Sequence, residues 1–400
     1  MLTKIYAGKA KGEFTAPPSK SMAHRYLICS ALAEGKSLID NVSYSNDIHA
    51  TINCLKSIGV SISVKRRKAS VENSGEYKSG CILDCMESGS TLRFLIPICL
   101  ALGIDVTFKG SERLLSRPLD VYEKICRESG FVFEKENEKL HVCGKLKPGK
   151  YVISSEVSSQ FASGLLFSLP LLSEDSEIVF DGKVNSRSYI EMTLSAIRDF
   201  GIDAGWTSEN TILIKGNQKY SERQCRIEGD YSNAAFFEAM NYLGSEISVK
   251  GLREDSLQGD RVAFEFFKKM KEGFCEIDIS DCPDLAPVLM ALGGALNGVK
   301  LTGTTRLKVK ESNRGEVMKQ ELEKFGIKTD VQDDTITVYK SKLTSPKKTI
   351  DSHNDHRIAM ATAVLMTVTG GEIEGSQAVN KSFPEFFEEM EKLGIGVQNF

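Results

Sequence analysis

Hydrophobic positions along the chain recur in two kinds of helical stretch, and each kind occurs six times. The first kind is amphipathic and ends in a glycine before a short strand-like run, at Gly59, Gly130, Gly201, Gly273, Gly326 and Gly394. Glycine enters the left-handed backbone conformation at little cost, so it is the expected residue just past a helix end. Successive glycines of this set are 71, 71, 72, 53 and 68 residues apart, which indicates a repeated structural unit.

The second kind of stretch is apolar nearly all round, so these helices are predicted to be buried. Most copies open with Ser or Asp, whose side-chain oxygens accept hydrogen bonds from free N–H groups at a helix start. The copies span residues 19–35, 88–103, 158–172, 230–244, 281–298 and 354–371.

Short alternating or β-branched runs, such as 177–182 and 335–339, lie between the helices and predict strands. The fold class is therefore α+β, an α/β repeat of six strand–helix–strand–helix–strand–strand units. Six units form two similar domains of three, with a hinge near residue 226 in the polar segment 215–228. We expect one domain at 14–225. The other domain comprises residues 226–400 together with the N-terminal strand in 1–13.

The composition of the chain argues against nucleic acid and membranes as binding partners. The 51 Lys and Arg against 54 Asp and Glu give a net charge of −3 over 400 residues, so no global field attracts nucleic acid or an anionic membrane. The most apolar runs, 94–103 and 164–172, are about half the ~20 residues of a membrane-spanning helix. The N-terminus lacks the apolar core of a signal peptide, and ten scattered cysteines suit reduced thiols. These features predict a cytoplasmic protein.

Polar and basic residues gather at helix starts and in the loops before them. They are Lys20, Ser21, Arg25, Gly89, Arg93, Arg117, Ser158, Ser159, Gln160, Ser186, Arg187, Tyr189, Asp284, Lys310, Glu311, Arg314, His356, Arg357 and Lys381. Helix N-termini bind anions, whereas a cation there opposes the helix dipole, so this repeated placement predicts a small ligand with several negative charges.

Simpler roles stay open for several of these residues. Ser158 and Ser159 suit helix capping as well as a phosphate, Asp284 could be only a cap, and Glu311 could pair locally with Arg314 three residues on. His353 and His356 have a spacing found among metal ligands, but no third ligand is evident.

Nine motifs in order resemble the EPSP synthases, the enolpyruvyl transferases that act on shikimate 3-phosphate. They are PPSKSMAHR (17–25), ESGSTLR (87–93), SERLLSRPLD (111–120), SSQF (158–161), SRSY (186–189), PDLAP (283–287), KVKESNR (308–314), NDHR (354–357) and KSFPEFF (381–387). The resemblance covers essentially the whole chain. It implies the inside-out α/β barrel of this family, a monomer, and an active site in the interdomain cleft. The domain at 14–225 would face shikimate 3-phosphate, and the other domain would face phosphoenolpyruvate.

The alternative is a UDP-N-acetylglucosamine enolpyruvyl transferase, which shares the fold and the chemistry. That family carries a reactive cysteine before its Arg-Pro loop, whereas residues 112–118 here contain none. The resemblance therefore implies transfer of the enolpyruvyl group of phosphoenolpyruvate to the 5-hydroxyl of shikimate 3-phosphate, by addition and elimination through a tetrahedral intermediate. This is a step of the shikimate pathway to chorismate and aromatic amino acids, and it needs no metal or organic cofactor.

Matching positions to the family motifs implies roles for individual residues. Asp284 would be the base on the 5-hydroxyl, Glu311 the acid/base at the methylene carbon, and Lys20 a cation between the substrates. Shikimate 3-phosphate would be bound by Lys20, Ser21, Arg25, Ser158, Ser159, Ser186, Tyr189, Asp284 and Lys310. Phosphoenolpyruvate would be bound by Lys20, Gly89, Arg117, Gln160, Arg314, Arg357 and Lys381. Positions 87, 90, 306 and 313 depart from the common pattern, but Gly89 keeps its turn free of a side chain, so glyphosate is expected to bind there.

Overall fold

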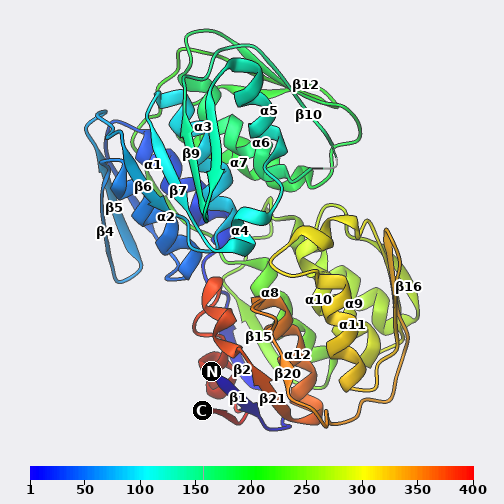
Figure 1. Ribbon diagram of the computed structural model, residues 1–400. Helices are drawn as coiled ribbons and strands as arrows, with labels where there is room; N and C mark the ends of the chain where they lie inside the picture. Colours follow the sequence, from blue (N-terminus) through cyan, green and yellow to red (C-terminus); the bar gives the residue numbers. More distant parts are fainter. Residues whose placement is uncertain (156) are drawn as a thin grey trace. The chain divides into compact units, whose positions relative to one another are not determined.

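The computed structural model describes residues 1–155 and 157–400, and the chain divides into two compact units (Figure 1). The inserted unit comprises Pro18–Glu228, and the terminal unit comprises Met1–Pro17 with Gly229–Phe400. Strand β2 (Lys11–Thr15) pairs in parallel with β15 (Glu246–Lys250). The N-terminal segment therefore stays with the terminal unit as far as Pro17, a few residues beyond the limit drawn from sequence.

The inserted unit contains three four-stranded sheets, ordered β14-β3-β5-β4, β6-β7-β9-β8 and β10-β11-β13-β12. In each sheet the first pair is parallel and the other two pairs are antiparallel. The strands are β3 (Gly35–Asp40), β4 (Ser61–Lys65), β5 (Lys68–Asn73), β6 (Cys81–Asp84), β7 (Val106–Lys109), β8 (Val132–Glu136), β9 (Lys139–Cys143), β10 (Lys150–Ile153), β11 (Ser176–Phe180), β12 (Ala204–Ser208), β13 (Thr211–Ile214) and β14 (Gln224–Arg226).

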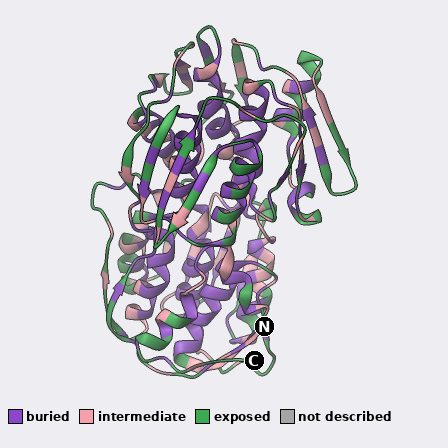
Figure 2. Ribbon diagram, turned by 90° about the vertical axis from the view of Figure 1, so that its left-hand side faces the viewer, coloured by how far each residue is buried: buried purple, intermediate pink, exposed green. Residues whose placement is uncertain are grey.

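Two classes of helix alternate along the inserted unit, as the hydrophobic pattern predicts. The largely buried class is α1 (Lys20–Leu32), α3 (Gly89–Leu102) and α6 (Ser159–Ser168), and η1 (Leu169–Leu171) extends α6. The amphipathic class is α2 (Asn46–Ser57), α5 (Asp120–Ser129) and α7 (Arg187–Asp199), with the short α4 (Glu112–Ser116) before α5. Side chains of Ser19, Ser88 and Ser158 cap the three buried helices. Figure 2 shows buried residues, in purple, along many of the helices of the chain.

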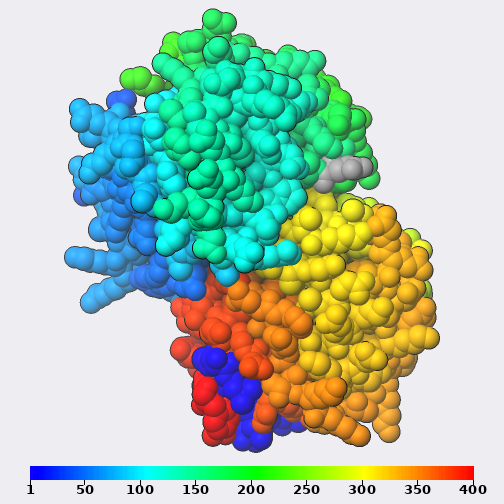
Figure 3. All heavy atoms as spheres, viewed as in Figure 1, coloured from blue at the N-terminus to red at the C-terminus, as the bar shows by residue number. Residues whose placement is uncertain are grey.

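The terminal unit contains sheets ordered β20-β21-β1-β22, β16-β17-β19-β18 and β15-β2. Its remaining strands are β1 (Leu2–Ile5), β16 (Cys275–Asp278), β17 (Val299–Thr302), β18 (Thr329–Val331), β19 (Thr335–Val338), β20 (Ile350–Asp351), β21 (Gly371–Glu374) and β22 (Val397–Asn399). Strand β1 lies between β21 and β22 and is antiparallel to both. The two ends of the chain therefore share one sheet, and their atoms lie side by side in Figure 3.

The helices of the terminal unit follow the same alternation. They are α8 (Tyr231–Tyr242), α9 (Ala263–Glu272), α10 (Ala286–Ala295), α11 (Arg314–Lys324), α12 (His356–Thr369) and α13 (Phe386–Lys392), with short helices η2 (Gly259–Val262), η3 (Pro283–Leu285), η4 (Thr305–Val309) and η5 (Ser376–Lys381). Helices α8, α10 and α12 are apolar and buried along most of their length. No helix in the described part of the chain is long and apolar enough to cross a membrane.

The fourth repeat differs from the predicted unit. Helix α9 leads directly through Gly273 and Phe274 into β16, with no hairpin between them. The lost hairpin accounts for the short interval between Gly273 and Gly326. The predicted left-handed stop is also wrong at Gly273, whose φ of 173° is extended backbone. The other five glycine stops have φ between 71° and 108°.

Candidate active site

Lys20 is the first residue of α1, and its amine is held by a carboxylate. Lys20 Nζ lies 2.8 Å from Oδ2 of Asp47, in the first turn of α2. Both side chains are largely buried, with 15% and 13% of their surface exposed. The motifs did not point to Asp47, and the only sequence signal for it is an acidic residue at a helix start. Asp47 fixes the direction in which the Lys20 amine points.

The structure brings Arg25, Ser21 and Tyr189 together. The guanidinium of Arg25 donates to the carbonyls of Ser21 and Tyr189 at 2.7 and 2.8 Å, and to Oγ1 of Thr193 at 2.9 Å. Burial lowers the pKa of Arg25 to about 10. Arg25 therefore remains a cation at neutral pH and joins the start of α1 to α7.

A buried chain of hydrogen bonds links α1 to the start of α3. Nδ1 of His24 lies 2.8 Å from Oγ1 of Thr51, which lies 2.7 Å from Oγ1 of Thr91. Thr91 reaches Oγ of Ser88, the cap of α3, at 2.7 Å. Burial and the charges of Lys20 and Arg25 hold the pKa of His24 well below its usual range. The chain of bonds therefore rests on a neutral imidazole.

The start of α3 faces two guanidinium groups. A Cβ built on Gly89 would lie 2.8 Å from Nη1 of Arg117 and 3.0 Å from Nη1 of Arg93. Nε of Arg117 is buried and has no hydrogen-bond partner among the described residues. Arg93 donates to Gln160 at 2.9 Å, and Gln160 donates to Oγ of Ser90 at 2.9 Å. Two cations beside a helix N-terminus are an arrangement suited to an anion, and Arg93 is one of them although the motifs gave it no role.

The serines assigned to the 3-phosphate lie at the starts of α6 and α7. Ser158 accepts a hydrogen bond from the Gln160 amide at 3.3 Å, so its capping role is real. Ser159 is buried with 8% of its surface exposed, and Ser186 is fully buried. Ser186 precedes α7 with a left-handed φ of 54°, a conformation that side chains other than glycine adopt at a cost.

Asp284 in the terminal unit is surrounded by three cations. Its Oδ1 receives Lys310 at 3.1 Å and Arg314 at 2.8 Å, and its Oδ2 receives Arg357 at 3.0 Å. Burial alone would raise the pKa of Asp284, but Arg357, Lys310 and Arg314 hold it well below its usual range. Asp284 lies within η3, and the N-cap residue of this helix is Cys282.

Arg314 joins the residues of this cluster. It is almost fully buried, and it also donates to Oε2 of Glu311 at 2.6 Å and to Oδ2 of Asp355 at 2.9 Å. The local Glu311–Arg314 pair considered from the sequence is therefore present. Asp355 was missed by the motif comparison, although it opens the NDHR segment's helix: its side chain caps α12 by accepting from the Arg357 amide at 2.9 Å.

Two further polar groups of the terminal unit lie beside this cluster. Lys381, at the end of η5, donates to the carbonyl of Asn354. Asp260 is buried, and Ser232 donates to its Oδ2. Burial and the charge of Asp284 raise the pKa of Asp260 to about 6, against the opposing effect of Arg357. Two neighbouring carboxyl groups thus differ in pKa: that of Asp260 is raised and that of Asp284 is lowered.

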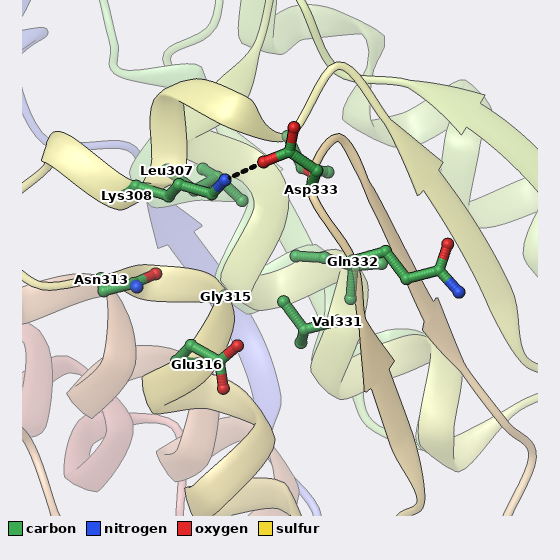
Figure 4. A pocket seen from close by; sticks show the side chains of 10 residues that line it. Leu307, Lys308, Asn313, Gly315, Glu316, Val331, Gln332 and Asp333 are labelled. Atoms are coloured by element: carbon green, nitrogen blue, oxygen red, sulfur yellow. Dashed lines mark hydrogen bonds and ion pairs between the residues drawn. The ribbon is translucent and has the colours of Figure 1, made fainter.

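A pocket of about 300 Å³ lies beside residues 307–316, the segment that includes Lys310, Glu311 and Arg314 (Figure 4). Asn313 and Glu316 line it from the start of α11, and Gln332 and Asp333 line it from the β18–β19 turn. Lys308 pairs with Asp333 across it. Asn313, which departs from the family pattern, faces this pocket, whereas Glu311 and Arg314 are not among its lining residues. No group of three or more His, Cys, Asp or Glu side chains in the described residues is arranged to hold a metal ion.

Comparison with known proteins identifies the family. The family model described as EPSP synthase (3-phosphoshikimate 1-carboxyvinyltransferase) matches residues 6–390. The chain belongs to the EPSP synthase family. A curated EPSP synthase family member, the 3-phosphoshikimate 1-carboxyvinyltransferase of Clostridium kluyveri, is 41% identical over 96% of both chains. That of Clostridium novyi is 38% identical over 98% of this chain and 97% of its own.

Solved structures support the fold of the EPSP synthase family. Two structures of EPSP synthase from Acinetobacter baumannii match all of this chain with TM-scores of 0.81 and 0.82, at identities of 24% and 23%. This likeness confirms the α/β repeat expected from the sequence. The family match and the curated relatives do not favour the UDP-N-acetylglucosamine alternative. The chain is a transferase of the EPSP synthase family.

Proposed function

We propose that the chain transfers the enolpyruvyl group of phosphoenolpyruvate to the 5-hydroxyl of shikimate 3-phosphate, with release of phosphate. Membership of the EPSP synthase family carries this proposal. Phosphoenolpyruvate and shikimate 3-phosphate each bear a phosphate and a carboxylate, and the buried cations at helix starts are suited to anions of this kind. We further propose that the enzyme works as a cytoplasmic monomer.

Asp284 is proposed as the base on the 5-hydroxyl. Its carboxylate is held ionised by Lys310, Arg314 and Arg357, so it can accept a proton without first losing one. Glu311, beside Arg314, is proposed to deliver the proton to the methylene carbon of phosphoenolpyruvate. The 5-oxygen bonds to C2 as Asp284 takes its proton, which gives a tetrahedral intermediate with a methyl group. Glu311 then takes a proton back from that methyl carbon while the C2–O bond to phosphate breaks, so the double bond re-forms and phosphate leaves.

The binding roles divide between the two units. Arg25, Ser21, Ser158, Ser159, Ser186 and Tyr189 in the inserted unit are proposed to bind shikimate 3-phosphate, with Lys310 contributing from the terminal unit. Gly89, Arg117 and Gln160 in the inserted unit, and Arg314, Arg357 and Lys381 in the terminal unit, are proposed to bind phosphoenolpyruvate. Lys20 serves both substrates. The 5-oxygen of shikimate 3-phosphate must reach C2 of phosphoenolpyruvate for transfer. Both sets of residues must therefore hold their substrates at the same time during turnover.

Release of phosphate tests the proposal. The chain is incubated with phosphoenolpyruvate and either shikimate 3-phosphate or UDP-N-acetylglucosamine, and phosphate is measured over time. With phosphoenolpyruvate present, phosphate release is expected when the acceptor is shikimate 3-phosphate and not when it is UDP-N-acetylglucosamine. The opposite result would overturn the proposal. Lys20→Ala should fold and lose turnover, whereas Lys65→Ala, at an exposed position of the same unit, should retain it.

A further inference from the structure

Glu321 is a buried carboxylate outside the proposed substrate-binding set. Only 2% of its side-chain surface is exposed. Its Oε1 lies 2.9 Å from Nε2 of His353, and its Oε2 accepts from the Asp351 amide at 3.0 Å and from Nζ of Lys324 at 2.7 Å. A buried carboxylate is retained only where such partners offset its desolvation. Two of its three partners belong to the segment that leads into α12.

Arg314 and Glu321 lie seven residues apart on α11, so they project from the same face, two turns apart. Arg314 donates to the carboxylate of Asp355. The carboxylate of Glu321 accepts from the Asp351 amide and is hydrogen-bonded to the His353 ring; these contacts are called the grip of α11 on the turn. Helix α11 therefore holds the turn of residues 351–355 at both of its ends.

The turn between these two grips has an unfavourable backbone. His353 and Asn354 are consecutive non-glycine residues with left-handed φ values of 49° and 53°, and such residues persist only where their surroundings enforce them. The same turn places three groups of the proposed active site. Asp355 receives Arg314, the Asn354 carbonyl receives Lys381, and Arg357 follows in the first turn of α12.

We propose that Glu321 is a positioning residue for phosphoenolpyruvate binding, acting through His353 and the 351–355 turn. Its carboxylate keeps His353 in the left-handed conformation, which sets where Asp355, Arg357 and the Asn354 carbonyl lie. Loss of this grip lets the turn relax, so Arg314, Arg357 and Lys381 no longer converge on the same anion. The inference rests on the proposed function for its kinetic consequence, but the grip itself does not depend on the substrate.

Glu321→Ala is compared with Glu323→Ala, an exposed glutamate of the same helix. The KM for phosphoenolpyruvate is expected to rise about tenfold in Glu321→Ala, because small displacements of positioning groups are costly. The KM for shikimate 3-phosphate should stay within about twofold, and Glu323→Ala should match the parent chain. Glu321→Gln, which keeps an acceptor for the Asp351 amide, should show a smaller rise. An unchanged KM for phosphoenolpyruvate, or an equal rise in both KM values, would overturn the proposal.

A second substitution separates positioning from general loss of packing. Glycine adopts a left-handed φ freely, so His353→Gly added to Glu321→Ala should recover part of the KM for phosphoenolpyruvate. No recovery would contradict the role of the strained turn. If Glu321→Ala does not fold, Glu321→Gln with and without His353→Gly serves the same comparison.

Hydrogen exchange of the unliganded chain tests the grip without the reaction. Backbone amides of residues 352–357 should exchange faster in Glu321→Ala than in Glu323→Ala, and equal rates would overturn the proposal. A parent chain that releases no phosphate with either acceptor would instead refute the proposed function, and the exchange result would still decide the grip.

Discussion

Nη1 of Arg314 donates to Oδ1 of Asp284 at 2.8 Å, so a proposed ligand of phosphoenolpyruvate is held by the proposed base. Arg357 makes the same kind of contact with the other oxygen of Asp284 at 3.0 Å. Under the proposed roles, anionic substrate groups compete with Asp284 for these two guanidiniums. A turn of Arg314 and Arg357 toward substrate would raise the pKa of Asp284 and make the carboxylate a stronger base.

This relationship predicts the kinetic signature of Asp284→Asn. The variant keeps the shape of the side chain but removes the base, so kcat should fall by about 10²–10⁴-fold. The KM for phosphoenolpyruvate should not rise, because the variant frees Arg314 and Arg357 for the substrate. Steady-state kinetics with saturating shikimate 3-phosphate measure both constants. A kcat within tenfold of the parent value would remove Asp284 from the role of base.

Gly89→Ala tests the anion site at the start of α3. The added Cβ would lie 2.8 Å from Nη1 of Arg117, a flexible side-chain end that can shift without disturbing the fold. We expect the KM for phosphoenolpyruvate to rise about tenfold and inhibition by glyphosate to weaken, with the KM for shikimate 3-phosphate unchanged. The matched control is Gly205→Ala in the same unit, where a Cβ meets no atom within 4 Å. Equal kinetics in the two variants would show that Gly89 does not border the phosphoenolpyruvate site.

The parts of the molecule that were predictable from sequence are those with local signals. The buried helices and their serine caps follow from largely apolar stretches preceded by Ser19, Ser88 and Ser158. The missing hairpin after α9 was legible only as one short interval, since spacing alone does not say which strand is lost. Asp47 and Asp355 escaped prediction because their partners, Lys20 and Arg314, are distant in sequence. Long-range ion pairs leave no periodic trace, so only the tertiary structure reveals them.

Asp260→Asn should stabilise the terminal unit at neutral and higher pH. The pKa of Asp260 is raised to about 6 in the folded chain, above the value of 3.8 expected when unfolded. The native state therefore binds the proton more tightly, and stability falls as pH rises from about 4 to 6 and stays low above it. Removing the charge should add on the order of 1–3 kcal/mol at pH 8. Thermal unfolding at pH 4.5 and pH 8 checks this, and a gain that is equal at both pH values would contradict it.

His24 predicts a pH dependence of opposite sign in the inserted unit. Its pKa is well below 6.5 in the folded chain, since burial and the charges of Lys20 and Arg25 disfavour the imidazolium. Below pH 6.5 the unfolded state binds a proton that the native state does not, so stability is lost as pH falls. Between pH 6.5 and 5.5 this loss is at most about 1 kcal/mol, because the unfolded imidazole is already half protonated at pH 6.5. His24→Asn has no such proton to bind, so its loss of stability over this interval should be smaller by that amount.

The single tryptophan of the sequence, Trp206, lies in the inserted unit and reports its unfolding by fluorescence in urea. Parallel curves for the parent chain and the variant would mean that His24 is protonated in the native state, and that the bonds from His24 through Thr51 to Thr91 do not rest on a neutral ring.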